Sequence, residues 1–125
     1  MSDELLIKAT EDTPEINFSS LTGVLQISGR SLPEDAFSFY EPVQNWLTSY
    51  ALTFPEQTNA LIKLEYFNTA SAKQIFKILQ TLCQLSKQKP VKVKWFYDVG
   101  DKEMLASGQR FSKLCGVELE FCVNG

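Results

Sequence analysis

Alternation of apolar and charged residues is the sequence feature that most constrains the fold of this chain. In residues 91–95, Val and Trp alternate with two lysines, and in residues 117–121, Val, Leu and Phe alternate with two glutamates. Lys63 and Glu65 alternate with apolar neighbours in the same way. Side chains along a strand point to opposite faces, and a sheet covered on both faces would show continuous apolar runs. The pattern predicts helices on one face and a charged, solvated opposite face with cross-strand pairs; use of that face for docking is the alternative.

The spacing of apolar residues changes along the chain in the order βββαβαβαβ. Short β-favouring runs separated by turn-forming residues predict strands, and apolar residues three or four positions apart predict helices. The first three strands are expected to be antiparallel, and residues 1–125 are expected to form one α/β domain with a mixed sheet and about three helices. The expected strands are residues 5–9, 16–19, 24–28, 60–67, 91–97 and 117–123. The first expected helix starts at residues 31–34, the second spans 69–87 and the third spans about 101–114.

Local signals add detail to two of the helices. Ser31 and Glu34 have the spacing of a capping box, in which a hydroxyl and a carboxylate accept hydrogen bonds from free N–H groups at a helix start. Pro42 disfavours helical angles at Glu41, which predicts a short turn before the main part of the first helix. Gly108 weakens the last helix.

Histidine is absent from all 125 residues, and this excludes several kinds of chemistry. Ser-His-Asp and Cys-His catalysis, His-ligated zinc and histidine proton shuttling all require imidazole. The sequence contains neither G-x-G-x-x-G nor a Walker-type loop, and no spacing of Asp and Glu singles out an acid and a base. We therefore predict a protein that is not an enzyme and that holds no cofactor or metal ion.

Charge and cysteine content predict the partners and the compartment. A net charge of −3 without a basic tract argues against nucleic acid as a partner. The acidic start and the lack of a long apolar stretch argue against membrane insertion and secretion. Cys83, Cys115 and Cys122 form no C-x-x-C pair and are expected to be buried thiols. We predict a cytoplasmic protein.

Three polar clusters follow the third, fourth and fifth expected strands. Parallel strands joined by crossover helices end at one edge of the sheet, where functional loops usually lie. Convergence of the clusters at that edge is inferred from topology. Their polar and charged members are Arg30, Ser31, Asn68, Thr69, Ser71, Asp98 and Asp101.

Thr69 stands where the helix of residues 69–87 should be capped. One interpretation is that its hydroxyl caps the helix and stabilises it by about 1 kcal/mol. The alternative is phosphorylation, because a phosphate at a helix start meets free N–H groups and the favourable end of the helix dipole. The residues themselves leave both interpretations open.

Two further interpretations concern charges at the same edge. Asp98, Asp101 and Glu103 are close enough in sequence to suggest Mg²⁺, but Asp101 is also expected to cap a helix and Glu103 suits a first turn. Arg30 is the cation that the third strand brings to this edge, and pairing with Glu34 or an aspartate is its simplest role.

Four segments of the chain resemble the SiaC-like family, small bacterial regulatory phosphoproteins. The specific segments are the Gly-Arg-Ser-x-Pro-Glu run of residues 29–34 and the Tyr-Phe-Asn-Thr-x-Ser-x-Lys run of residues 66–73. Residues 39–43 with the Trp-Leu pair at 46–47, and residues 95–98 with Asp101, Met104 and Gly108, extend the resemblance over nearly the whole chain.

The resemblance implies a STAS-like fold, similar to anti-sigma-factor antagonists, and a phosphorylation switch. In such proteins a Ser/Thr kinase phosphorylates a threonine that matches Thr69, and a PP2C-type phosphatase removes the phosphate. The unmodified form binds and activates a diguanylate cyclase, which raises cyclic di-GMP and promotes aggregation and biofilm formation. Ala70 and Ala72 stand where serines are common in the family, so Ser71 is the one nearby hydroxyl.

The sequence thus predicts a switch surface around the phosphoacceptor Thr69, and a different function remains as the alternative. The alternative is a small-ligand-binding or generic protein-interaction module, with a pocket among Arg30, Tyr66, Trp95 and Tyr97 unless these aromatics pack in the core. The expected switch surface consists of Arg30, Ser31, Asn68, Ser71, Lys73, Asp98 and Asp101.

Overall fold

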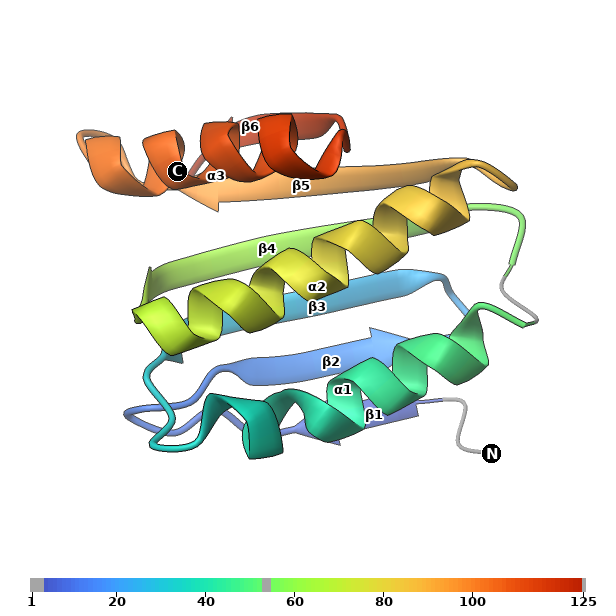
Figure 1. The fold of residues 1–125 in the computed structure, drawn as a ribbon, viewed down its shortest axis with the longest axis horizontal. Helices are drawn as coiled ribbons and strands as arrows, with labels where there is room; N and C mark the ends of the chain where they lie inside the picture. Colours follow the sequence, from blue (N-terminus) through green and yellow to red (C-terminus); the bar gives the residue numbers. More distant parts are fainter. Residues whose placement is uncertain (1–3, 53–54, 125) are drawn as a thin grey trace.

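Six strands form one sheet in the order β1-β2-β3-β4-β5-β6 in the computed structural model, which describes residues 4–52 and 55–124 (Figure 1). The chain order βββαβαβαβ predicted from the sequence is confirmed. The elements are β1 Glu4–Ile7, β2 Glu15–Ser19, β3 Val24–Ser31, α1 Ala36–Tyr50, β4 Thr58–Phe67, α2 Thr69–Ser86, β5 Val91–Tyr97, α3 Lys102–Cys115 and β6 Leu119–Val123.

The sheet is mixed, with an antiparallel part followed by a parallel part. β1, β2 and β3 pair antiparallel, as the sequence predicted. β3, β4, β5 and β6 pair parallel, and a helix connects each parallel pair. The carboxyl ends of β3, β4 and β5 therefore lie along one edge, where α2 and α3 begin.

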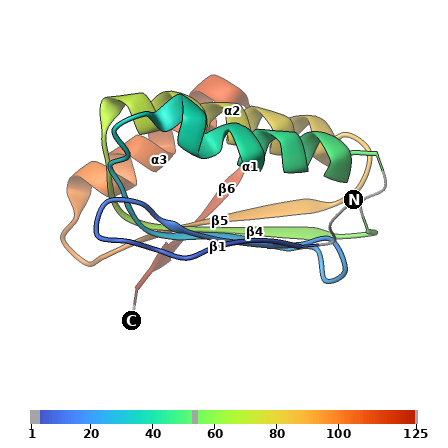
Figure 2. The ribbon, with the colours of Figure 1, turned by 90° about the horizontal axis from the view of Figure 1, so that it is seen from below.

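All three helices cover the same face of the sheet, as the alternation predicted (Figure 2). The opposite face carries cross-strand pairs: Lys94 Nζ lies 3.7 Å from a carboxylate oxygen of Glu120, and Lys63 Nζ lies 4.9 Å from the centroid of the Phe96 ring. Both pairs join neighbouring strands, which fits the prediction of a solvated, charged face.

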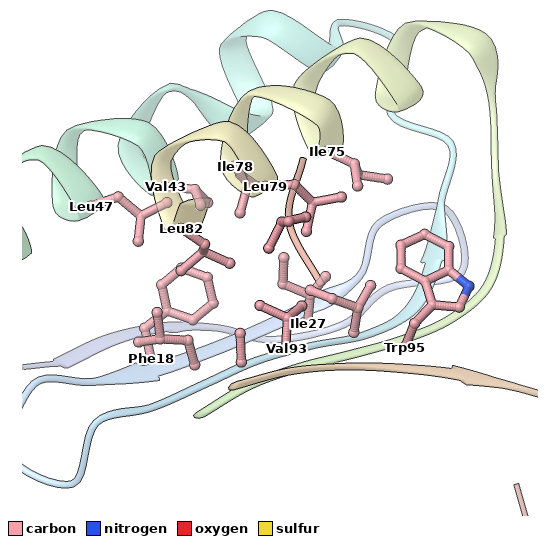
Figure 3. Close-up of a cluster of buried hydrophobic side chains, with 14 of the residues drawn as sticks. Phe18, Ile27, Val43, Leu47, Ile75, Ile78, Leu79, Leu82, Val93 and Trp95 are labelled. Carbon is pink, nitrogen blue, oxygen red and sulfur yellow. The ribbon is translucent and has the colours of Figure 1, made fainter. Parts of the chain in front are cut away.

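The core lies between the helices and the covered face of the sheet (Figure 3). Apolar residues of α1 and α2 recur at helical spacing, so one side of each helix packs onto the strands. Trp95 is completely buried at the α3 end of this core, and its indole Nε1 donates a hydrogen bond to the carbonyl of Met104 at 3.0 Å. The labelled core residues of α1 and α2 are Val43, Leu47, Ile75, Ile78, Leu79 and Leu82.

Two sequence predictions about α1 are wrong. Ser31 and Glu34 form no capping box, because β3 extends to Ser31 and the helix is capped by Asp35, whose carboxylate accepts from the N–H of Ser38 at 3.1 Å. Pro42 does not interrupt the helix. Pro42 is exposed while its neighbours Tyr40 and Val43 are buried, so packing on both sides of the proline holds the helix together despite one missing hydrogen bond.

The cysteines also differ from expectation. Cys83, Cys115 and Cys122 are free thiols, but each is only half-buried. Cys83 and Cys115 face the boundary between α2 and α3, where the helices do not close over one another completely. The gap between α2 and α3 leaves Cys83 and Cys115 partly accessible, and Cys122 lies on the edge strand β6.

Gly108 is the position at which α3 comes closest to the sheet. A Cβ atom at Gly108 would lie 2.7 Å from the indole of Trp95 and 2.8 Å from the ring of Phe121. The glycine that weakens the helix in the sequence therefore allows the close packing of α3 onto β5 and β6.

Replacing Gly108 with Ala is expected to destabilise the protein. Alanine raises helix propensity by about 1 kcal/mol, but overpacking against two rigid aromatic rings costs about 1 to 3 kcal/mol. Urea denaturation should show a lower midpoint for Gly108→Ala than for the wild type. Gln109→Ala, at the exposed neighbouring position, is the control and should be neutral or slightly stabilising. A Gly108→Ala variant more stable than the wild type would contradict this account.

Candidate functional site

A β-bulge shapes the edge at which the candidate site lies. Gly29 pairs with Leu64, but the next residue, Arg30, pairs with Tyr66, so β4 contains one extra residue there. Gly29 has a φ of 112°, which a residue with a side chain rarely adopts. After the bulge, Phe67 faces the helices, where its ring lies near those of Trp95 and Phe111. The chain then enters α2 directly.

A buried chain of hydroxyl groups joins β3, α1 and α2 beneath this edge. Ser31 Oγ donates to Ser71 Oγ at 2.8 Å, and Ser71 Oγ donates to the carbonyl of Ser31 at 3.1 Å. The hydroxyl oxygens of Tyr40 and Ser31 are 2.6 Å apart. Because Ser31 uses its proton toward Ser71, Tyr40 is the donor to Ser31. All three residues are 0 % exposed, so water cannot replace these bonds.

Burial of the Tyr40 hydroxyl has an electrostatic consequence. Removal from water raises the pKa of Tyr40 to about 12. The neutral phenol is therefore the form that the folded protein favours. The hydroxyl chain is a structural tie between elements and offers no reactive group at neutral pH.

Asn68, and not Thr69, caps α2. The side-chain oxygen of Asn68 accepts from the N–H of Ser71 at 2.8 Å, and the N–H of Asn68 donates to the carbonyl of Ser31 at 3.0 Å. The interpretation of Thr69 as the cap is therefore wrong by one residue. Thr69 is the first residue of the helix and is exposed.

The backbone around Thr69 has unused hydrogen-bonding capacity. Among the hydrogen bonds of the described residues, none is donated by the N–H groups of Thr69 or Ala70. Such groups at a helix start favour a negatively charged oxygen nearby. The hydroxyl of Thr69 thus lies in solvent beside free donors, while Asn68 holds the helix start in place.

The residues of the expected switch surface fall into three groups by their exposure. Arg30, Lys73 and Asp98 are exposed, and Asn68 and Asp101 are half-buried. Ser31 and Ser71 are wrong as surface residues, because both are fully buried in the hydroxyl chain. The sequence did not reveal that the hydroxyl groups of Ser31 and Ser71 bond to each other, because the two residues are 40 positions apart. The hydroxyl of Ser71 is consequently not accessible to a modifying enzyme in the folded protein.

The acidic residues after β5 have structural partners. Asp101 caps α3 by accepting from the N–H of Met104 at 3.0 Å, as expected. Asp98 accepts from the side-chain amide of Asn124 at 2.9 Å, which ties it to the segment after β6. Within residues 4–52 and 55–124, no three His, Cys, Asp or Glu side chains gather closely enough to hold a metal ion.

The pocket expected among Arg30, Tyr66, Trp95 and Tyr97 is not formed as proposed. Trp95 is 0 % exposed and belongs to the core, while Tyr66 is 51 % exposed on the other face of β4. Core packing therefore explains Trp95, and Tyr66 lies on the opposite face of the sheet from it. Sequence reasoning missed the role of Tyr40. Its spacing in the chain predicted a buried side of a helix, but did not show that its hydroxyl bonds to Ser31 on a different element.

Known proteins are similar to this chain in sequence and in fold. A model of SiaC family regulatory phosphoproteins matches residues 7–124. The chain belongs to the SiaC family. The structure of apo-SiaC from Pseudomonas aeruginosa is similar to it with a TM-score of 0.85 and 26 % identity, covering 100 % of both chains.

Two further relatives extend the comparison of this SiaC family protein. A chain in the crystal structure of the diguanylate cyclase SiaD in complex with its activator SiaC, from Pseudomonas aeruginosa, has a TM-score of 0.89 and 25 % identity, covering 96 % of this chain and 99 % of that one. An uncharacterized Pseudomonas aeruginosa protein is 28 % identical over 116 residues, covering 92 % of this chain and 91 % of its own. No helix in the described part of the chain has the length and apolarity to cross a bilayer.

Substitutions at Asn68 and Thr69 should show which of the two residues caps α2 in this SiaC family protein. Asn68→Ala removes the cap and is expected to lower the free energy of unfolding by about 1 kcal/mol. Thr69→Ala removes a hydroxyl that holds nothing in place and is expected to change it by less than about 0.5 kcal/mol. Chemical denaturation of both variants makes the comparison. A larger loss for Thr69→Ala than for Asn68→Ala would show that Thr69 is the cap.

Tyr40 should give the protein a stability that is lost at high pH. Its pKa is about 12 in the folded state against an ordinary value of 10, so its contribution is complete below pH 10 and disappears as the pH rises to about 12. A rise of this size corresponds to about 2 to 3 kcal/mol. Tyr40→Phe lacks the ionisable group, so its unfolding free energy should fall less between pH 10 and 12 than that of the wild type. Parallel pH profiles for the two proteins would contradict this assignment.

Proposed function

We propose that this chain is a non-enzymatic phosphorylation switch with Thr69 as the phosphoacceptor. In its unmodified form it binds and activates a diguanylate cyclase in the cytoplasm, and thereby promotes cyclic di-GMP synthesis, aggregation and biofilm formation. A Ser/Thr kinase modifies Thr69, and a PP2C-type phosphatase reverses the modification. Membership of the SiaC family and the similarity to SiaC in complex with SiaD support this proposal.

The observation that carries the proposal is the separation of two roles between adjacent residues. Asn68 caps α2, so the exposed hydroxyl of Thr69 is available for modification without loss of the helix start. A phosphate there would add about −1.5 to −2 charges beside free N–H groups that favour an anion. Modification therefore changes the surface that a partner meets and leaves the fold intact.

The partner enzymes supply the chemistry in this scheme. The chain contains no histidine, and its buried hydroxyl chain is closed on itself. The arrangement around Thr69 presents the threonine hydroxyl to a kinase and provides no base that would activate this hydroxyl. The chain is accordingly a substrate of the kinase and the phosphatase, and a ligand of the cyclase.

Thr69 should be the residue that the kinase modifies. We expect incubation with ATP and the Ser/Thr kinase of this switch to add one phosphate, which peptide mapping by mass spectrometry assigns to Thr69. Thr69→Ala should abolish the addition. Thr48→Ala, at an exposed threonine of α1, is the matched control and should be modified like the wild type. Phosphate on another residue, or addition that persists in Thr69→Ala, would refute the assignment.

A further inference from the structure

β6 is the last strand of the sheet, and its outer side has no neighbouring strand in the described part of the chain. The strand pairs with β5 on its inner side, and Figure 1 shows it at the margin of the molecule. An edge strand carries backbone N–H and C=O groups that no neighbour uses, and these groups can pair with a strand of another chain.

Three residues of β6 direct their backbone groups to the open side. The N–H of Asn124 donates to the carbonyl of Tyr97 on β5 at 2.8 Å. Backbone groups point to alternate sides along a strand, so residues 120 and 122 also face β5. The N–H and C=O groups of Leu119, Phe121 and Val123 therefore point away from the sheet.

β6 lacks the features that usually protect an edge strand. Lysine, proline or a bulge on the edge commonly prevents pairing with another chain. The sequence of β6 is Leu-Glu-Phe-Cys-Val, and its register with β5 is continuous over all five residues. Its one charged residue, Glu120, lies on the uncovered face beside Lys94. The open side of β6 is thus accessible to a further strand.

The side chains of β6 are complementary to those of a second copy in one antiparallel register. When Phe121 lies opposite Phe121 of the second copy, Leu119 lies opposite Val123, and Glu120 lies opposite Cys122. The apolar pairs share the face that α3 covers, since Leu119 is buried and the Phe121 ring lies beneath Gly108. Because Glu120 meets a thiol and not a second carboxylate, no like charges are directly opposite.

The backbone groups fit the same register. The residues that face each other across the twofold axis, Phe121 with Phe121 and Leu119 with Val123, are those whose N–H and C=O groups point outward. In an antiparallel ladder, each such pair exchanges two N–H···O bonds. A register shifted by one residue would place the apolar side chains of one copy opposite Glu120 and Cys122 of the other.

We propose that two copies of this chain associate through antiparallel pairing of their β6 strands, centred on Phe121. The two sheets then form one continuous sheet, and the same surface serves in both copies, as a twofold interface requires. This inference stands on the edge of the sheet and does not rest on the proposed function.

α3 adds apolar surface beside the paired strands. Leu114 faces α2, because it lines the gap between the two helices. Leu105 is nine positions earlier, which places it on the opposite side of α3 at about 3.6 residues per turn. Leu105 is half-buried and lies toward the β6 edge. In the dimer it lies next to α3 of the second copy, which removes more of its surface from water.

The pairing leaves the candidate site open in both copies. Thr69 lies at the start of α2, and α3 separates α2 from the β6 edge (Figure 1). A dimer therefore presents two separate Thr69 hydroxyl groups. Phosphorylation of Thr69 should not change the association of the two copies.

Sedimentation velocity over a series of concentrations tests the association. The wild type should show a species of twice the mass of the chain, and Val123→Pro should raise its dissociation constant about tenfold or more, because proline removes an outward N–H group from each copy. The bond from Asn124 to β5 is kept, so thermal unfolding should resemble that of the wild type. Leu6→Lys, at a 64 % exposed position of the opposite edge strand β1, is the matched control and should dimerise like the wild type.

A cysteine cross-link tests the register without a change in the backbone. Glu120 and Cys122 of the second copy form a pair without hydrogen bonds, whose Cα atoms are about 4.5 Å apart, within the range of a disulfide. Glu120→Cys should therefore give a covalent dimer under air oxidation, with peptide mapping showing a link between positions 120 and 122. Lys92→Cys, exposed on the same face of β5, is the control and should give no such link.

The outcomes decide the inference in either direction. A wild-type dimer that Val123→Pro weakens, together with the link between positions 120 and 122, supports it. A wild type that sediments as a single chain at every concentration overturns it. A dimer that folded Val123→Pro forms equally well overturns the assignment to β6, and a covalent dimer linked through other positions overturns the register.

Discussion

The carbonyl of Ser31 accepts two hydrogen bonds, one from the backbone N–H of Asn68 and one from the hydroxyl of Ser71. These bonds fix the end of β3 to the first turn of α2, and Tyr40 adds α1 to the same point. The groups are buried, so breaking one bond would leave a polar atom without water. The position of Thr69 depends on this junction, because Thr69 lies between Asn68 and Ser71 in sequence.

The junction gives the candidate site its combination of rigidity and access. Buried partners on either side hold the helix start, while the side chain of Thr69 remains exposed. The bulge at Gly29 turns Phe67 into the core and so sets the direction in which the chain enters α2. In the proposed switch, a modifying enzyme would meet a hydroxyl on a fixed surface, and the added charge would act on neighbouring side chains instead of melting the helix.

Much of the fold was predictable from local patterns, and the site was predictable only in part. Alternation along β5 and β6 predicted helices on one face, and Asp101 was predicted as a cap from its place before α3. The capping box at Ser31 was wrong because burial of the Ser31 hydroxyl depends on Tyr40 and Ser71, which lie on two other elements of the fold. The gap between α2 and α3 at Cys83 and Cys115 likewise depends on how two helices pack, which the spacing within each helix does not determine.

The central claim is that a phosphate on Thr69 changes the affinity for the partner without disturbing the fold. The most direct measurement titrates the diguanylate cyclase with unmodified chain and with chain fully phosphorylated on Thr69, after thermal unfolding has confirmed that both forms are folded. The account predicts similar unfolding temperatures and at least tenfold weaker binding by the phosphorylated form. Equal affinities of two folded forms would contradict it.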